Sequence, residues 1–390
     1  MVRRRKIGLI YEYNENWIGG TYYIQNLISA LKQNDGPVIP ELYIYTDNDE
    51  HFQQLKAATQ YPFLYRGGLH FIKKFVGNRA AKKLSSLLLN KKPLSYFKKK
   101  LDFVFPAAHE SWFHPGQPFI YWIPDFQEHY LPEFFSQEDL AERKSYQLAL
   151  TKKAKYIIFS SRAVQDDFNT IYPGAKVSQF VLPFAVTHPQ LENNVNYREK
   201  YALDIPYFIC CNQFWKHKNH FKILDAVKIL KEQGKEVHVV FTGKEQDYRN
   251  PLYFGEIKDT VQSFQIGSNV SFLGFINRED QLSLISSSLA VIQPSLFEGW
   301  STVVEDAKSL KVNILASDLK VHREQLQGYP TALFFDPLSG ASLAEQMNKL
   351  LDGPITKNLY DYNSSIAYFG KNFMTVINEI QPVNGLSKNP

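Results

Sequence analysis

The sequence predicts an α/β protein with two doubly wound, Rossmann-like domains. Short apolar runs that are typical of buried parallel strands alternate with helical patterns from the N-terminus onward. A polar stretch near residue 190 interrupts this alternation, which then starts again. The 390 residues, 44% of them hydrophobic, supply enough apolar material for two cores. We therefore place a first domain at 1–190, a second at 191–355, an aromatic-rich helical segment at 356–380 and a flexible tail at 381–390.

Five apolar runs predict the strands of the first domain, namely Lys6–Tyr11, Glu41–Tyr45, Leu101–Ala107, Phe119–Ile123 and Ala154–Ser160. The first run is followed by a loop that ends in Gly19 and Gly20, and then by a helix pattern over Thr21–Leu31. Glycine between a strand and a helix lets the backbone approach a phosphate closely, although the full dinucleotide fingerprint is lacking here. By itself this arrangement does not identify a phosphate site.

Six apolar runs predict the strands of the second domain, namely Tyr207–Cys211, Val237–Thr242, Val270–Leu273, Leu289–Ile292, Val312–Ala316 and Ala332–Phe335. The loop Phe297–Ser301 after the fourth run leads into a helix, because Thr302 and Glu305 form a capping-box pattern. Ligands of doubly wound sheets bind at such strand ends, where free N–H groups and the positive end of a helix dipole point outward. Gly299 would let a phosphate approach this backbone.

The composition excludes several other classes of protein. No apolar run approaches the length of a membrane span, and the first strand is too short and too soon followed by an acid for a signal peptide. Cys210 and Cys211 are adjacent, so a disulfide between them would be strained, and they lack partners for a metal site. This cysteine usage predicts a cytosolic protein.

The formal net charge of +5 is unevenly distributed. The segment 71–101 contains ten basic residues and no acidic one, with apolar residues at roughly helical spacing. Such a segment suggests docking on an anionic membrane surface or an acidic partner, and the alternative is a solvated face over an ordinary core helix. Nucleic acid is not expected as a partner, because no recognised binding module accompanies the charge.

The stretch from Pro294 to Asp318 resembles the nucleotide-sugar signature of bacterial polysaccharide glycosyltransferases of family 4, which are retaining enzymes of the GT-B architecture. In that signature, a glutamate followed by glycine is separated by seven residues from a second glutamate. Here Glu298 precedes Gly299, and the second position falls on Asp306, with Glu305 beside it. The resemblance implies an acceptor domain and a donor domain that face each other across a cleft, and a C-terminal helix that crosses back onto the first domain.

The resemblance also implies roles for these residues. Glu298 would contact the donor sugar, and either Asp306 or Glu305 would contact the ribose hydroxyls. The alternative for Glu305 is a helix cap. Amide groups at Ser301 and Thr302 would face the developing charge of the leaving diphosphate.

The turn after the first strand of the second domain supplies basic residues. Lys218 matches a lysine that neutralises the donor pyrophosphate in the family, whereas the family's arginine position falls on Gln213 or Asn212. Lys216 would replace the missing charge, although a lysine lacks the bidentate fork of an arginine. In the family, a glycine pair at the place of Gly19–Gly20 faces the diphosphate across the cleft.

Polar residues after two strands of the first domain predict the acceptor side. Asp125 lies in a loop that resembles the family's acceptor loop, and it can accept a proton or orient an acceptor hydroxyl. His109, and after it His129, are further candidates because histidine titrates near neutral pH. The alternative for each histidine is a structural hydrogen bond within its loop.

Asp47 and Asp49 form an Asp-x-Asp pattern after the second strand. This pattern resembles the metal–diphosphate motif of GT-A glycosyltransferases, but a polar turn has the same composition. We interpret it as a turn, so no metal is expected.

The resemblance implies a metal-independent, retaining glycosyltransferase. It would move a hexose-type sugar from a nucleotide-diphosphate sugar to a hydroxyl of a glycan or lipid-linked acceptor, in polysaccharide or glycoconjugate synthesis. We expect it in the cytoplasm, peripheral to the inner face of the cell membrane, with no cofactor besides the nucleotide sugar. The alternative is a catalytically inactive partner protein that binds nucleotide sugars, which the missing arginine and the aspartate at 306 suggest.

Overall fold

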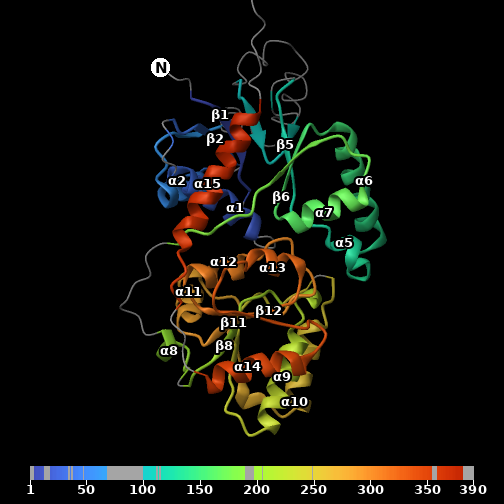
Figure 1. The fold of residues 1–390 in the computed structure, drawn as a ribbon, viewed down its shortest axis with the longest axis vertical. Helices are drawn as coiled ribbons and strands as arrows, with labels where there is room; N and C mark the ends of the chain where they lie inside the picture. The colour runs from blue at the N-terminus through green and yellow to red at the C-terminus, as the bar shows by residue number, and fades with distance from the viewer. Residues whose placement is uncertain are drawn as a thin grey trace, which may run out of the picture.

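The computed structural model describes residues 4–12, 18–33, 36, 38–46, 48–67, 100–110, 113, 116–188, 197–203, 205–247, 249–353 and 358–380. Figure 1 shows two lobes stacked along the long axis of the molecule, each with a sheet flanked by helices. The predicted α/β class with two Rossmann-like domains is therefore confirmed. Asp47, and the basic segment 71–101 apart from Lys100 and Leu101, lie outside the described residues.

The N-terminal lobe holds two groups of strands in which every recorded pairing is parallel. The strands are β1 (Lys6–Ile10), β2 (Glu41–Tyr45), β3 (Leu64–Arg66), β4 (Phe103–Phe105), β5 (Ile120–Ile123), β6 (Tyr156–Phe159) and β7 (Ser178–Val181). Their order is β3-β2-β1-β4 in one group and β5-β6-β7 in the other, and a parallel bridge between Val104 and Phe119 joins the groups. β3 and β7 were not predicted, because both are partly exposed strands at sheet edges and neither is a continuous apolar run.

The helices of this lobe include one from the far end of the chain. They are α1 (Ile18–Lys32), α2 (Asp49–Thr59), α5 (Gln127–Tyr130), the 3-10 helix η4 (Pro132–Phe134), α6 (Gln137–Lys153), α7 (Arg162–Ile171) and α15 (Tyr362–Glu379). α15 packs along α1, as Figure 1 shows. The approach is close, since a Cβ atom at Gly370 would lie 2.5 Å from the carbonyl oxygen of Ala30. The C-terminal helix thus adds Phe369 and Phe373 to the N-terminal core.

The C-terminal lobe holds a six-stranded sheet in the order β10-β9-β8-β11-β12-β13. Its strands are β8 (Phe208–Cys210), β9 (Val239–Phe241), β10 (Val270–Phe272), β11 (Ala290–Gln293), β12 (Asn313–Ser317) and β13 (Ala332–Phe335). Its helices are α8 (Tyr197–Lys200), η5 (Lys216–Lys218), α9 (His220–Glu232), α10 (Tyr253–Ser263), η6 (Gly267–Asn269), α11 (Arg278–Ser286), α12 (Thr302–Ser309), α13 (Lys320–Gln325) and α14 (Gly340–Asp352). One core cluster lies under α9, α10 and α14, and another under α11 and α12.

The strand order of the C-terminal lobe creates a switch point between β8 and β11. The chain leaves β8 toward β9 on one side of the sheet, and it leaves β11 toward β12 on the other side. In open parallel sheets, ligands bind outside the carboxyl ends of the two strands at such a point. The loops after β8 and β11 are therefore the place to look for a site.

Two further observations concern the chain as a whole. Cys210 and Cys211 are both buried free thiols, as expected from their adjacency. Within the described ranges, no helix has the length and apolar character needed to cross a membrane.

Candidate functional site

The loops after β8 and β11 bring together a lysine and a glutamate. Lys218 ends η5, and Glu298 lies in the loop that leads to α12. The Nζ atom of Lys218 is 2.6 Å from Oε1 of Glu298, and only 16% and 10% of the two side chains are exposed. These residues, eighty positions apart, thus meet at the switch point between β8 and β11.

The carboxylate of Glu298 is held in its ionised form. Oε1 accepts hydrogen bonds from Lys218, from Gln293 Nε2 at 2.7 Å and from Ser295 Oγ at 2.7 Å. Burial by itself would raise the pKa of Glu298, but the charge and hydrogen bond of Lys218, the nearby His322 and the hydrogen bond from Ser295 outweigh burial and lower it. Sequence reasoning missed Gln293 and Ser295, whose only signal is that they are polar residues at the end of an apolar strand.

The N-terminus of α12 is capped one residue earlier than the sequence pattern indicated. Ser301 is the N-cap, and its Oγ accepts from the Val304 amide at 3.3 Å. Gln325 of α13 clamps the backbone of Ser301, accepting from its N–H at 3.2 Å and donating to its carbonyl at 2.8 Å. Within the described residues, the amides of Thr302 and Val303 make no hydrogen bond, so they remain available to an anion.

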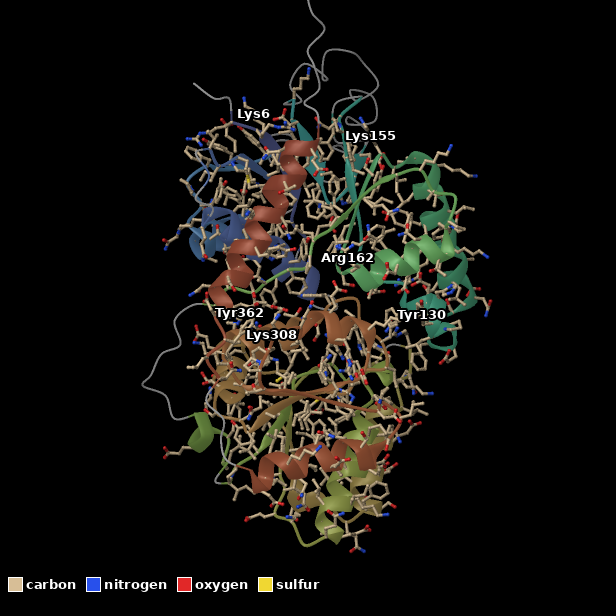
Figure 2. All side chains as sticks on the ribbon, in the orientation of Figure 1. Lys6, Tyr130, Lys155, Arg162, Lys308 and Tyr362 are labelled. Carbon is tan, nitrogen blue, oxygen red and sulfur yellow. The ribbon has the colours of Figure 1, made fainter. Side chains whose placement is uncertain are left out.

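Glu305 does not complete a capping box, so that prediction was wrong. It is 1% exposed, and it accepts from Lys308 at 2.9 Å, from Gln325 at 3.0 Å and from the Tyr362 hydroxyl at 2.6 Å. Figure 2 labels Lys308 and Tyr362 where α12 meets the start of α15. Glu305 therefore joins the C-terminal lobe to the crossing helix.

Asp306, the other candidate for the ribose contact, is also buried and paired. It is 0% exposed. Nη1 and Nη2 of Arg278 lie 2.7 Å and 2.5 Å from its two oxygens, and His188 Nε2 lies 3.4 Å from Oδ1. Which of the two acids contacts a ribose therefore stays a prediction.

The first turn of α1 faces the N-terminus of α12 across the boundary between the lobes. A Cβ atom at Gly19 would lie 3.5 Å from Oγ1 of Thr302. Gly19 and the buried Gly20 belong to helix α1 itself, so the predicted glycine loop before the helix was wrong. The helix begins at Ile18 because tertiary packing overrides the low helix propensity of glycine.

The loop after β5 touches the loop after β11, which places Asp125 near Glu298. A Cβ atom at Gly299 would lie 2.1 Å from the carbonyl oxygen of Pro124 and 2.9 Å from Cβ of Asp125, so only glycine fits. Beside this contact, the rings of Tyr130 and Phe297 stack with centroids 5.4 Å apart. Figure 2 shows Tyr130 at the boundary between the lobes.

Burial raises the pKa of Asp125, and the negative charges of Glu128 and Glu298 raise it further. A raised pKa in the folded state means that the ionised form disfavours folding, so stability falls as the pH rises through this pKa. We expect Asp125→Asn to increase the free energy of unfolding at pH 7.5, and the gain to shrink at about pH 4, near the ordinary pKa of an aspartate. Urea denaturation at both pH values measures it.

The matched control for Asp125→Asn is Asp352→Asn, at a carboxyl whose pKa is shifted in the opposite direction. The hydrogen bond from Lys235 lowers the pKa of Asp352, so Asp352→Asn removes a favourable interaction and should not stabilise the protein. A loss of stability in Asp125→Asn at pH 7.5 would show that this carboxylate is structurally required.

The remaining candidates lie away from the Lys218–Glu298 pair. Lys216 is exposed, and its Nζ lies 5.5 Å from the ring centroid of Phe134 in the N-terminal lobe. His109 pairs with Glu12 at 2.6 Å in the loops after β4 and β1. His129 is exposed and contacts the ring of Tyr130 edge-on. No contact recorded among the described residues joins these three to Glu298.

Further contacts hold the lobes together beside the site. The carboxylate of Glu324, on α13, accepts from the amides of Arg162 at 2.8 Å and Ala163 at 3.0 Å, at the N-terminus of α7. The indole of Trp300 donates to the carbonyl of Phe184 at 3.0 Å. Both contacts border a cavity of about 760 Å³ between the lobes.

Comparison with known proteins gives one family match and several similar folds. Residues 196–366 match the family described as Glycosyl transferases group 1. The Anabaena protein Alr3699/HepE, solved with UDP and glucose, is 15% identical, with 96% of this chain and 95% of that chain covered and a TM-score of 0.64.

Two other solved structures are similar over nearly their whole length. The lipopolysaccharide outer core galactosyltransferase WaaB is 16% identical, with 96% and 99% of the chains covered and a TM-score of 0.56. The trehalose-6-phosphate synthase OtsA is 12% identical, with 97% and 100% covered and a TM-score of 0.64. At these identities the likeness shows the fold. The chain therefore has the GT-B fold, and its residues 196–366 match the glycosyl transferases group 1 family.

Proposed function

We propose that this protein is a retaining glycosyltransferase that moves a hexose-type sugar from a nucleotide-diphosphate sugar to a hydroxyl of a glycan or lipid-linked acceptor. The observation that carries the proposal is the Lys218–Glu298 pair at the switch point, next to an α12 N-terminus with two available amides. The family match over 196–366, and a similar fold solved with UDP and glucose, support a nucleotide sugar as donor.

The diphosphate of the donor would lie between Lys218 and the N-terminus of α12. An ammonium group has three N–H donors, of which one goes to Glu298, so two remain for phosphate oxygens. The amides of Thr302 and Val303 and the positive end of the helix dipole add to this site. Gly19 brings the backbone of α1 close to Thr302, because no side chain projects from it toward the N-terminus of α12.

The chemical step breaks the bond between the anomeric carbon and the β-phosphate oxygen and forms a bond from that carbon to the acceptor oxygen. The acceptor proton passes to an oxygen of the leaving diphosphate, so no strong protein base is required. Lys218 and the α12 amides stabilise the negative charge that develops on the diphosphate. Glu298 accepts hydrogen bonds from sugar hydroxyls, and Asp125 orients the acceptor hydroxyl.

This charge arrangement supports a mechanism without a bound metal ion, in which Lys218 and the helix replace the cation. Adding a chelator should then leave the rate unchanged.

We propose that the protein works in the cytoplasm against the inner face of the cell membrane, in polysaccharide or glycoconjugate synthesis, and the basic segment 71–101 supports this location. Co-sedimentation with anionic vesicles at low and high salt tests the location.

A donor screen tests the function. The purified protein is incubated with UDP-, GDP- and ADP-sugars, and released nucleoside diphosphate is measured with and without candidate hydroxyl acceptors. The proposal predicts slow release with one donor, faster release with a true acceptor, and no effect of chelator. Tight binding of a donor without release under any condition would favour the inactive partner protein instead.

A further inference from the structure

The guanidinium of Arg278 pairs with the buried acid Asp306. Arg278 is the first residue of α11, and its guanidinium forms a bidentate pair with Asp306 through Nη1 at 2.7 Å and Nη2 at 2.5 Å. Nη1 also donates to Gln281 at 2.8 Å. Asp306 is fully buried, whereas 25% of the Arg278 side chain remains exposed. The acid therefore fixes the Nη1–Nη2 edge of the guanidinium in a side chain that is not fully buried.

Counting the N–H groups of the Arg278 guanidinium shows which of its edges has no hydrogen-bond partner among the described residues. A guanidinium has five N–H donors in a rigid plane. Three are used, two by Asp306 and one by Gln281. Within the described part of the chain, the N–H of Nε and the second N–H of Nη2 make no hydrogen bond. These two point the same way from neighbouring nitrogens, so together they form a fork for a pair of oxygen atoms.

This fork lies at the boundary between the lobes. Cζ of Arg278 is 5.3 Å from the ring centroid of Tyr22, which belongs to α1 of the N-terminal lobe. The first turn of the same helix places Gly19 against Thr302. The fork and the amide groups of α12 are therefore bounded by the same helix of the opposite lobe.

We propose that Arg278 binds the ribose of the nucleotide, with its Nε–Nη2 edge donating to the 2′ and 3′ oxygens, and that Asp306 is a positioning residue for the guanidinium. This inference rests on the proposed function. The sugar end of the donor lies at Glu298 and the diphosphate at Thr302, so the nucleoside continues away from Glu298. One helical turn separates Thr302 from Asp306, a rise of about 6 Å.

Charge and burial favour a ribose diol over a phosphate as the ligand of Arg278, and favour Arg278 over Asp306 as the residue that binds it. Both oxygens of Asp306 face Arg278, and the acid is 0% exposed, so it offers a nucleotide no accessible oxygen. Because Asp306 neutralises the guanidinium, the fork suits an uncharged pair of hydroxyl oxygens better than a further phosphate. The sequence hypothesis assigned the ribose to an acid, whereas the geometry assigns it to the arginine that the acid holds.

The test compares ribose with deoxyribose nucleotides. Affinities of UDP, ADP and GDP and of their 2′-deoxy forms are measured by calorimetry for the wild type, Arg278→Gln and the double variant Arg278→Gln/Asp306→Asn. The double variant leaves no unpaired buried charge, so it covers the case in which the single variant does not fold. The control is Arg323→Gln, which removes an exposed guanidinium that is also bidentate, to Asp318.

The wild type and Arg323→Gln should bind one ribonucleotide about 10- to 100-fold more tightly than its deoxy form, as expected for a lost hydrogen bond to a charged group. In both Arg278 variants this preference should fall below about threefold. An equal loss of affinity for both forms would make Arg278 a phosphate ligand and overturn the inference, as would an unchanged preference. If the wild type binds none of these nucleotides, the proposed function fails as well.

Discussion

Replacing Lys218 by alanine is expected to lower the rate of nucleoside diphosphate release by about 100- to 1,000-fold, because the variant loses the cation that faces the leaving diphosphate. The loss should appear in kcat as well as in kcat/KM, since the charge on the diphosphate grows in the transition state. The measurement is the initial rate of release from the donor that the screen identifies.

The same substitution should change how activity depends on pH. Lys218 is the main reason that the pKa of Glu298 lies below its ordinary value despite burial. Without the lysine, burial dominates and the pKa of Glu298 rises, so the fall in activity on the acid side should move to higher pH. The control is Lys222→Ala, which removes a partly exposed lysine paired with Asp225 on α9 and should leave rate and pH profile unchanged. A rate within about threefold of wild type in Lys218→Ala would remove the lysine from the mechanism.

Replacing Glu305 by alanine is expected to lower the free energy of unfolding by about 3–5 kcal/mol, because it leaves a charged partner buried without its counter-ion. That partner is Lys308, of which only 7% is exposed. The hydroxyl of Tyr362 loses its acceptor as well. Urea denaturation measures this effect, and the contact between α12 and α15 should loosen with it.

Two controls separate the role of Glu305 in stability from a role in binding. Glu345→Ala breaks an exposed pair with Lys349 and should cost less than about 0.5 kcal/mol. The double substitution Glu305→Leu/Lys308→Met removes both charges and should recover most of the loss. If Glu305→Ala instead weakens nucleotide binding and leaves stability unchanged, Glu305 is the ribose ligand that the sequence pattern suggested.

Much of the fold follows from local pattern. The apolar runs that end at Ile292, Ala316 and Phe335 lie within one residue of the ends of β11, β12 and β13. Because polar loops at the ends of parallel strands meet at one edge of the sheet, the loops that hold Lys218 and Glu298 could be expected near one another, but their direct pairing depends on the strand order.

The parts that could not be predicted depend on contacts between distant residues. Thr302 and Glu305 match a capping box locally, but Tyr362 of another helix is the partner that decides where the Glu305 side chain lies. Likewise, nothing in the spacing of Arg278 and Asp306 shows that they face each other across neighbouring helices. Local patterns identify elements, whereas such pairs follow from how the elements pack.

The most direct test of the central claim is phosphorus NMR of a nucleotide sugar incubated with the wild type and with Glu298→Gln, which keeps the shape of the side chain and removes its charge. The account predicts that the wild type converts the donor to nucleoside diphosphate. The variant leaves Lys218 without its counter-ion but should still be folded at the assay temperature, and it should be slower by about 100-fold. Conversion at the wild-type rate by Glu298→Gln would contradict the account.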